Sequence, residues 1–245
     1  MGRATVGSRV ELMLILGIES STQQVGVAIA GHEGVLAQAH SSRGKRHAES
    51  LTPAIEFVCK QARVELHEIS CVAVDLGPGL YTGLRVGVAS AKAMAQSLRV
   101  PMIGVASLDL LAFPVRFSPR RIVTAIDARR GELFYAFYRQ VPGGLQRLSD
   151  HQIGTPDDLA SELLASREDC LLVGDGALRY AEAFEGLTKV EVLDRGLAYP
   201  SASSLVQLAH AQALREQWVQ PWDLQPLYLR LPDAEINWAT REGRH

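Results

Sequence analysis

The chain contains 245 residues, of which 47% are hydrophobic and 21% charged, and its formal net charge at pH 7 is −2. This composition is typical of a globular protein and excludes a disordered chain, while the charge excludes a general attraction to nucleic acid. The three cysteines form no CxxC pair, which argues against a disulfide framework or a zinc site and favours a reducing, cytoplasmic location. The apolar run at 12–18 is too short to span a bilayer, so we expect no membrane contact.

Strand patterns open the chain. Residues 14–18 and 25–30 have the apolar, β-branched composition of strands, and the polar residues between them predict a hairpin turn. A further strand is predicted at 35–40. Residues 47–61 then place apolar side chains on one face of a helix.

The next segment combines a strand, a glycine-rich loop and a helix. Residues 69–74 have the composition of a buried strand and lead to a Gly-Pro-Gly loop, where glycine permits backbone angles that are closed to other residues. Thr82 is predicted to cap the following helix. Small residues recur in that helix at every fourth position, which favours close packing against another helix. They are Gly83, Gly87, Ala91 and Ala95.

The second half of the chain repeats the opening pattern. Predicted strands at 122–126 and 132–138 flank a polar turn, as in the first hairpin. This recurrence indicates an internal duplication, with chance similarity as the alternative. The remaining predicted elements are a strand at 145–153, a helix capped by Thr155, a strand at 171–173 and a helix at 201–217.

These elements predict an α/β protein of two duplicated lobes, each with a mixed sheet flanked by helices, similar to the actin, Hsp70 and sugar-kinase architecture. We place the first lobe at 12–118, the second at 119–230 and a tail at 231–245. In that architecture the hairpin turns grip nucleotide phosphates between the lobes. The residues predicted to face a nucleotide are Glu19, Ser21, Asp127, Gly174 and Gly176. The alternative is that the acids merely end strands at solvated turns and the glycines merely form a loop.

Several segments of the sequence resemble motifs of a known protein family. They are LGIESSTQQVGVAI, RHAESLTPAI at 46–55, DLGPGLYTGLRVGVASAKAMA, AIDARRGELFYA and PLYLR at 226–230. Together they resemble the TsaB (YeaZ) family, the bacterial accessory proteins of tRNA threonylcarbamoyladenosine biosynthesis. The resemblance runs from about residue 14 to residue 230, and the GPG-TGLR and DARRGE segments are its most specific part.

The resemblance implies a non-catalytic accessory subunit that binds a TsaD-type catalytic subunit in the threonylcarbamoylation of adenosine 37 in tRNAs reading ANN codons. It also implies a TsaE-type ATPase as a further partner and contact with tRNA only through the complex. When the chain is alone we expect a homodimer. We expect no cofactor on this chain by itself, with ATP or ADP bound at most by the complex.

A related catalytic family, TsaD, carries a metal-binding HxxxH pair where this chain has residues 101–111, which contain no histidine. We therefore predict no metal ligand and no catalytic residue, and we expect Ser107 to cap a helix instead. No GxSxG motif supports a peptidase. The alternative functions are a small-molecule ATP-dependent kinase of the same superfamily and a nucleotide-sensing module. The turn at 19–22 reads Glu-Ser-Ser-Thr, whereas such kinases have Asp followed by Gly-Asn-Thr.

The partner surface is predicted on the helices at 47–61 and 83–98, which would supply half of a four-helix bundle. Small side chains allow close approach, and larger apolar ones supply contact area. The predicted interface residues are His47, Leu51, Ile55, Leu84, Gly87, Val88, Ala91 and Ala95. The alternative is that the same side chains pack against the chain's own sheet.

Overall fold

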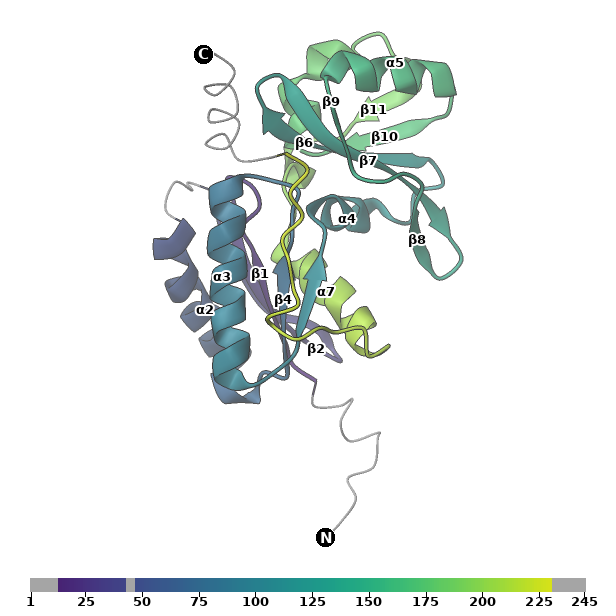
Figure 1. Ribbon diagram of the computed structural model, residues 1–245. Helices are drawn as coiled ribbons and strands as arrows, with labels where there is room; N and C mark the ends of the chain where they lie inside the picture. Colours follow the sequence, from purple (N-terminus) through teal and green to yellow (C-terminus); the bar gives the residue numbers. More distant parts are fainter. Residues whose placement is uncertain (1–12, 43–46, 231–245) are drawn as a thin grey trace, which may run out of the picture.

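A five-stranded mixed sheet forms the first lobe. The computed structural model describes residues 13–42 and 47–230. The strands of this sheet are β1 (Ile15–Glu19), β2 (Val25–Gly31), β3 (Gly34–Ser41), β4 (Cys71–Asp75) and β5 (Met102–Val105). Their order is β3-β2-β1-β4-β5: the first three are antiparallel, and β4 and β5 continue parallel to β1 (Figure 1).

The second lobe repeats this topology. Its strands are β6 (Arg121–Arg129), β7 (Glu132–Val141), β8 (Gly144–Arg147), β10 (Cys170–Val173) and β11 (Val190–Val192), and β9 (Gln152–Gly154) pairs with β7. Their order is β8-β7-β6-β10-β11, again with three antiparallel strands followed by two parallel ones. The shared order confirms the predicted duplication and the two-lobed α/β class.

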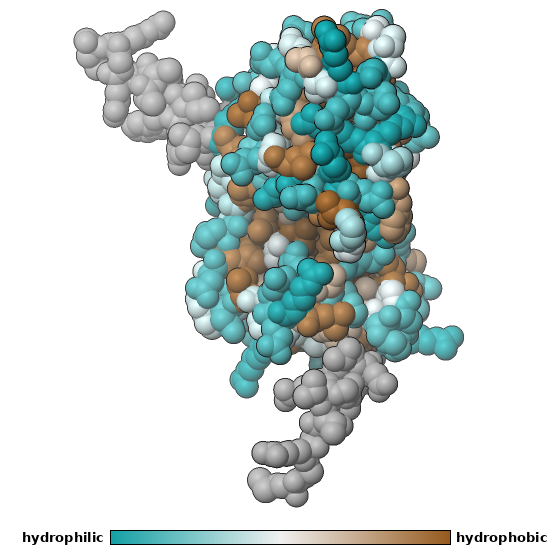
Figure 2. Space-filling view, turned by 90° about the vertical axis from the view of Figure 1, so that its right-hand side faces the viewer, coloured by the Kyte–Doolittle hydropathy of each residue, from teal (hydrophilic) through white to brown (hydrophobic). Residues whose placement is uncertain are grey.

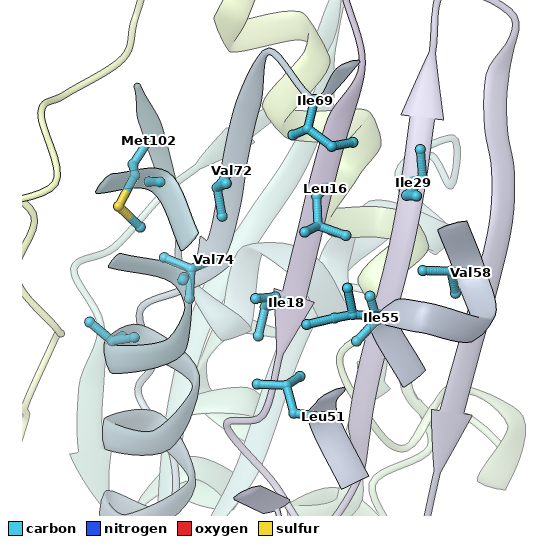
Figure 3. Packing of buried hydrophobic residues seen from close by; sticks show 14 of the residues in the cluster. Leu16, Ile18, Ile29, Leu51, Ile55, Val58, Ile69, Val72, Val74 and Met102 are labelled. Carbon is cyan, nitrogen blue, oxygen red and sulfur yellow. The ribbon is translucent and has the colours of Figure 1, made fainter. Parts of the chain in front are cut away.

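Helices complete the layers on both faces of the first sheet. They are α2 (His47–Ala62) and α3 (Tyr81–Leu98) on one face and α7 (Ala202–Ala213) on the other. Figure 3 shows the α2 side of this core, where Leu51 and Ile55 of the helix lie over Leu16 and Ile18 of β1. All four side chains are buried, so their removal from water stabilises the packing of helix on sheet.

Two helices cross between the lobes, which corrects the predicted boundaries at 12–118 and 119–230. Helix α4 (Ser107–Ala112), from the first half of the chain, packs through Leu108 and Leu111 on the core of the second sheet. Helix α7, from the second half, packs on the first sheet. The final segment also returns to the first lobe, because the Leu227 amide donates to the Leu76 carbonyl at 2.7 Å. The predicted tail at 231–245 lies outside the described residues, as does residue 12.

One helix cap predicted from the sequence is confirmed and another is wrong. Thr155 caps α5 as predicted, accepting from the amide of Asp158, whose carboxylate bonds back to the Thr155 amide. The predicted cap at Thr82 is wrong, because α3 begins at Tyr81 and its N-cap, Leu80, makes no side-chain cap bond. The remaining helices are α5 (Pro156–Ser166), α6 (Asp175–Arg179) and the short turns η1 (Leu66–Glu68), η2 (Phe113–Val115), η3 (Ala181–Phe184) and η4 (Arg195–Leu197). Within the described residues, no helix is long and apolar enough to cross a membrane.

Candidate functional site

Three distinctive sequence motifs converge on one cavity between the lobes. Its volume is about 390 Å³, and its walls come from residues 78–82 at the start of α3, 127–130 at the end of β6, and 227–230 near the end of the described chain. Phe134 of β7 completes the lining. In Figure 1 the 227–230 segment runs from the first lobe up to the second, between α3 and β6. On the face shown in Figure 2, hydrophobic side chains gather near mid-height, while the upper part is mostly hydrophilic.

The Gly-Pro-Gly loop is held against the first hairpin turn. The Leu80 amide donates to the Ser21 carbonyl at 2.7 Å. A Cβ atom on Gly79 would lie 2.2 Å from that same carbonyl oxygen, so the loop approaches the turn as closely as a residue without a side chain permits. The Ser20 hydroxyl adds a bond to the Gly83 carbonyl at 2.9 Å. These contacts fix one wall of the cavity and the start of α3.

The opposite wall is a tight hairpin with two arginines in the left-handed region. Arg129, Arg130 and Gly131 have φ values of 65°, 58° and 78°. Glycine adopts such angles freely, but side-chain-bearing residues do so at a cost. Asp127 offsets part of that cost, because its carboxylate accepts from the Arg129 amide at 2.9 Å and from the Arg129 guanidinium at 3.0 Å. Strained residues of this kind are concentrated at functional sites.

The C-terminal segment joins the two walls. The Tyr228 ring lies 5.3 Å from the Tyr81 ring at the start of α3, and the Arg85 guanidinium lies 5.4 Å from the Tyr81 centroid. Arg230 donates to the Ala128 carbonyl at 3.0 Å and forms an ion pair with Glu132 of β7. One stretch of chain therefore contacts both lobes, and the cavity holds aromatic rings beside guanidinium groups.

A second cavity, of about 290 Å³, lies on the other side of Asp127. It is lined by Gln23 of the first hairpin turn and by second-lobe residues that include Asp175 and Arg179. Asp175 accepts from the Asp127 amide at 3.1 Å. Burial raises the pKa of Asp175 to about 6, against the lowering effect of that hydrogen bond.

Of the five residues predicted to face a nucleotide, Asp127 lines both cavities. Glu19 and Ser21 are buried beneath the first hairpin turn. Gly174 packs against β6 and Gly176 against β7, since a Cβ atom on them would lie 2.1 Å from the Ala125 carbonyl oxygen and 2.5 Å from the Leu133 side chain, respectively. These four residues are not among those lining either cavity, so nucleotide contact stays a prediction that the geometry favours at Asp127 alone.

The predicted interface residues pack inward, which corrects their assignment. Seven of them have exposed fractions no greater than 7% or are buried glycine, and they contact the chain's own sheet, the hairpin turn or, for one of them, the Gly-Pro-Gly loop: Leu51, Ile55, Leu84, Gly87, Val88, Ala91 and Ala95. The side chain of His47 lies outside the described residues. The outward side of α3 instead presents a different series at the same spacing, which consists of Arg85, Ala89, Ala93 and Ser97. Phe57 of α2 is 50% exposed.

The segment that replaces the HxxxH pair is used for structural contacts. Ser107 does not cap α4 as predicted, because its hydroxyl donates to Asp75 at 2.6 Å. Asp109 accepts from the Tyr138 hydroxyl at 2.7 Å. Burial opposes the charge of Asp109, but hydrogen bonds from His151 and Tyr138 hold its pKa below the usual value. Among the described residues, no group of three or more His, Cys, Asp or Glu side chains is placed to hold a metal ion.

The cavity residues that sequence reasoning missed are Tyr81, Arg129, Arg130, Tyr228 and Arg230. All five lie inside the motifs quoted for the family resemblance, so the signal was present in the sequence. What the sequence lacked was any indication that these three separate motifs lie around one cavity.

Comparisons with known proteins find similarity to TsaD and to TsaB (YeaZ) proteins. The family model for TsaD, tRNA N6-adenosine threonylcarbamoyltransferase, matches residues 34–238. The TsaB protein of Bacillus subtilis, named a tRNA threonylcarbamoyladenosine biosynthesis protein, is 29% identical over 92% of this chain and 98% of its own length. An uncharacterised protein of Mycobacterium leprae is 33% identical over 94% of this chain, which spans 58% of that relative's length. YeaZ from Pseudomonas aeruginosa superposes with a TM-score of 0.78 at 25% identity, over 89% of this chain and all of that structure.

Proposed function

The chain belongs to the TsaB (YeaZ) family, and from this premise we propose that it acts in tRNA threonylcarbamoyladenosine biosynthesis as a non-catalytic accessory subunit. In this proposal it binds a TsaD-type catalytic subunit that modifies adenosine 37 of tRNAs reading ANN codons. A TsaE-type ATPase joins the complex, and tRNA is reached through the partners. In this proposal the chain by itself supplies a surface that binds its partners, and ATP or ADP is bound only by the assembled complex.

The observation that carries the proposal is the outward surface of α2 and α3. The two helices lie side by side over the first sheet (Figure 1). Their inner faces are already occupied by the core, which leaves the opposite faces for a partner. We name the outer strip as Phe57 of α2 with Arg85, Ala89, Ala93 and Ser97 of α3. Its four α3 positions are exposed and recur at every fourth residue.

This outer strip suits helix-on-helix association. Alanine and serine side chains let a second helix approach closely, so that its side chains pack between those of the strip. Phe57 supplies apolar area whose burial favours binding, and Arg85 at the end of the strip gives a charged contact that orients a partner. A pair of helices on the partner would complete a four-helix arrangement. The same surface serves a homodimer when no partner is present, because a two-fold axis pairs identical patches.

A substitution in the strip tests the proposal. Ala93→Trp places a large side chain on the exposed face of α3, and Ala165→Trp makes the same change on the exposed face of α5 in the second lobe. We expect Ala93→Trp to weaken binding of a purified TsaD-type subunit by about tenfold or more in isothermal titration calorimetry, because the added ring holds the helices apart. Ala165→Trp should bind like the wild type, and both variants should keep the wild-type circular dichroism spectrum.

Two results would contradict the proposal. Equal affinity of Ala93→Trp and Ala165→Trp for the partner would exclude the outer strip as the surface that binds the partner. Phosphoryl transfer from Mg-ATP to a small alcohol by the isolated chain would favour a kinase of the same superfamily instead.

A further inference from the structure

Two carboxylic acids lie side by side in the interior of the first lobe. β1 and β4 are parallel neighbours whose last paired residues are Ile18 and Val74, so the next position on each strand brings Glu19 beside Asp75. Glu19 is 0% exposed and Asp75 is 2% exposed. The Ser21 hydroxyl donates to Glu19 and also interacts with Asp75, which locates the two carboxyl groups around one hydroxyl.

Each carboxyl group has one oxygen that is well bonded and one that is not. Glu19 Oε1 accepts from the Ser21 amide and hydroxyl, both at 2.8 Å. Asp75 Oδ1 accepts from the Gly77 amide at 2.8 Å and from the Ser107 hydroxyl at 2.6 Å. Glu19 Oε2 and Asp75 Oδ2 are buried and have no hydrogen-bond partner in the part of the chain that the structure describes.

Among the residues that the structure describes, no positively charged group is found to act on this pair. The hairpin turn and the Gly-Pro-Gly loop contribute only hydroxyl and amide groups to it, and from α4 the titratable group that acts on Asp75 is a further acid, Asp109. Two buried carboxylates without a cation repel each other and have both lost their hydration, which makes the doubly ionised state unfavourable. A hydrogen atom between the two unpartnered oxygens would supply the missing donor and remove one charge.

We propose that Glu19 and Asp75 share a single proton in the folded protein, as a carboxyl–carboxylate pair. The direction of their titration agrees with this geometry. Burial, with a further contribution from the Asp75 charge, raises the pKa of Glu19 well above its usual value. Burial also raises the pKa of Asp75 to about 6, although hydrogen bonds from Ser107, Gly77 and Ser21 act in the lowering direction. The two values belong to the pair and not to either residue alone.

The shared proton would link three connections of the fold. Glu19 ends β1 and bonds the hairpin turn, Asp75 ends β4 and bonds the loop that lines the larger cavity, and Ser107 begins the helix that crosses to the second lobe. Because the folded chain binds a proton that the unfolded chain releases near pH 4, this contribution to stability is present at low pH. It is lost as the pH rises through the raised pKa of the pair, at about 6 and above.

Glu19→Gln tests the proposal, because the amide nitrogen of Gln supplies the donor that the proton would otherwise provide. We expect this variant to melt at nearly the wild-type temperature at about pH 5 and higher than the wild type at about pH 8, by about 2–4 °C or more. Glu56→Gln, an exposed change on α2, should show no such pH-dependent difference. The measurement uses the isolated chain, so its outcome is independent of any partner and of the proposed function.

Asp75→Asn provides a second variant with the same expected sign, since its amide nitrogen can donate to Glu19 Oε2. Carbon-13 NMR of the wild-type carboxyl carbons should also show one of the two groups protonated near neutral pH. The proposal is overturned if Glu19→Gln lowers the melting temperature equally at all pH values, or if both carboxyl carbons titrate near pH 4. It is equally overturned if the wild type at about pH 8 gains stability from Na⁺, K⁺ or Mg²⁺ at constant ionic strength while Glu19→Gln does not, because a cation would then occupy the pair.

Discussion

The two lobes place a pair of acids at similar positions, and the groups around the two pairs differ. Glu19 ends β1 and Asp127 lies near the end of β6, while Asp75 ends the parallel neighbour β4 and Asp175 closely follows the parallel neighbour β10. In the first lobe both acids are buried, and each has one oxygen without a hydrogen-bond partner among the described residues. In the second lobe Asp127 pairs with Arg129, at 3.0 Å, and with a second arginine of α6 while lining two cavities.

The duplicated lobes therefore place carboxyl groups at similar positions, but with different neighbours. In the second lobe Arg129 and Arg179 lie beside Asp127, which is itself only 5% exposed. Under a closed turn the same group is stable only with a proton or a donor. The second-lobe pair, which lines cavities beside arginines, is therefore the one suited to contact a ligand, and the first-lobe pair is suited to hold the fold together.

The largest expected difference between the lobes concerns their turns. Gly79→Ala should destabilise the chain by about 3 kcal/mol or more, because the added Cβ atom would lie 2.2 Å from the Ser21 carbonyl oxygen. Gly131→Ala in the second hairpin should cost only about 1 kcal/mol, since it has a positive φ but open space around it. Urea denaturation measures the free energy of unfolding of both variants. Equal losses would contradict the difference in crowding at the two glycines.

An intermediate effect is expected at Asp175. Its pKa is raised to about 6, so the folded chain binds a proton there that the unfolded chain releases near pH 4. Stability is therefore lost as the pH rises from about 4 through about 6, and Asp175→Asn should remove this loss, gaining about 1–2 kcal/mol at neutral pH. Thermal melts of the variant and the wild type from pH 4 to about pH 8 check the sign. A gain that does not grow with pH would refute the assignment.

The smallest expected change in stability is at Asp127, and its sign is opposite to the change expected at Glu19. Asp127→Asn removes the negative charge that faces two arginines and leaves an oxygen for the Arg129 amide. We expect a loss of about 1 kcal/mol at neutral pH, because these arginines are themselves about half exposed and water screens their attraction. Glu19→Gln in the other lobe should change stability in the opposite direction. If Asp127→Asn also stabilised the protein, the two pairs would not differ as described.

Much of this architecture is readable from local sequence. Alternating apolar strands and polar turns located both hairpins, and Thr155 with its following acids located the start of α5. The cavity-lining motifs were also visible as segments. The sequence did not show that these motifs meet, because the residues of a motif near residue 80 contain no information about its distance from a motif near residue 228.

The sequence by itself determined the duplicated strand pattern and the motifs that carry the family. Only the tertiary structure decided which side of α3 is buried, because small residues recur at every fourth position on both sides of that helix. Spacing reports that a helix can be approached closely, but not which element approaches it. The same holds for α7, which packs on the lobe opposite to its own half of the chain, and for Glu19 and Asp75, which meet only because β1 and β4 pair. Such non-local contacts follow from the free energy of the whole packed core, to which every element contributes at once.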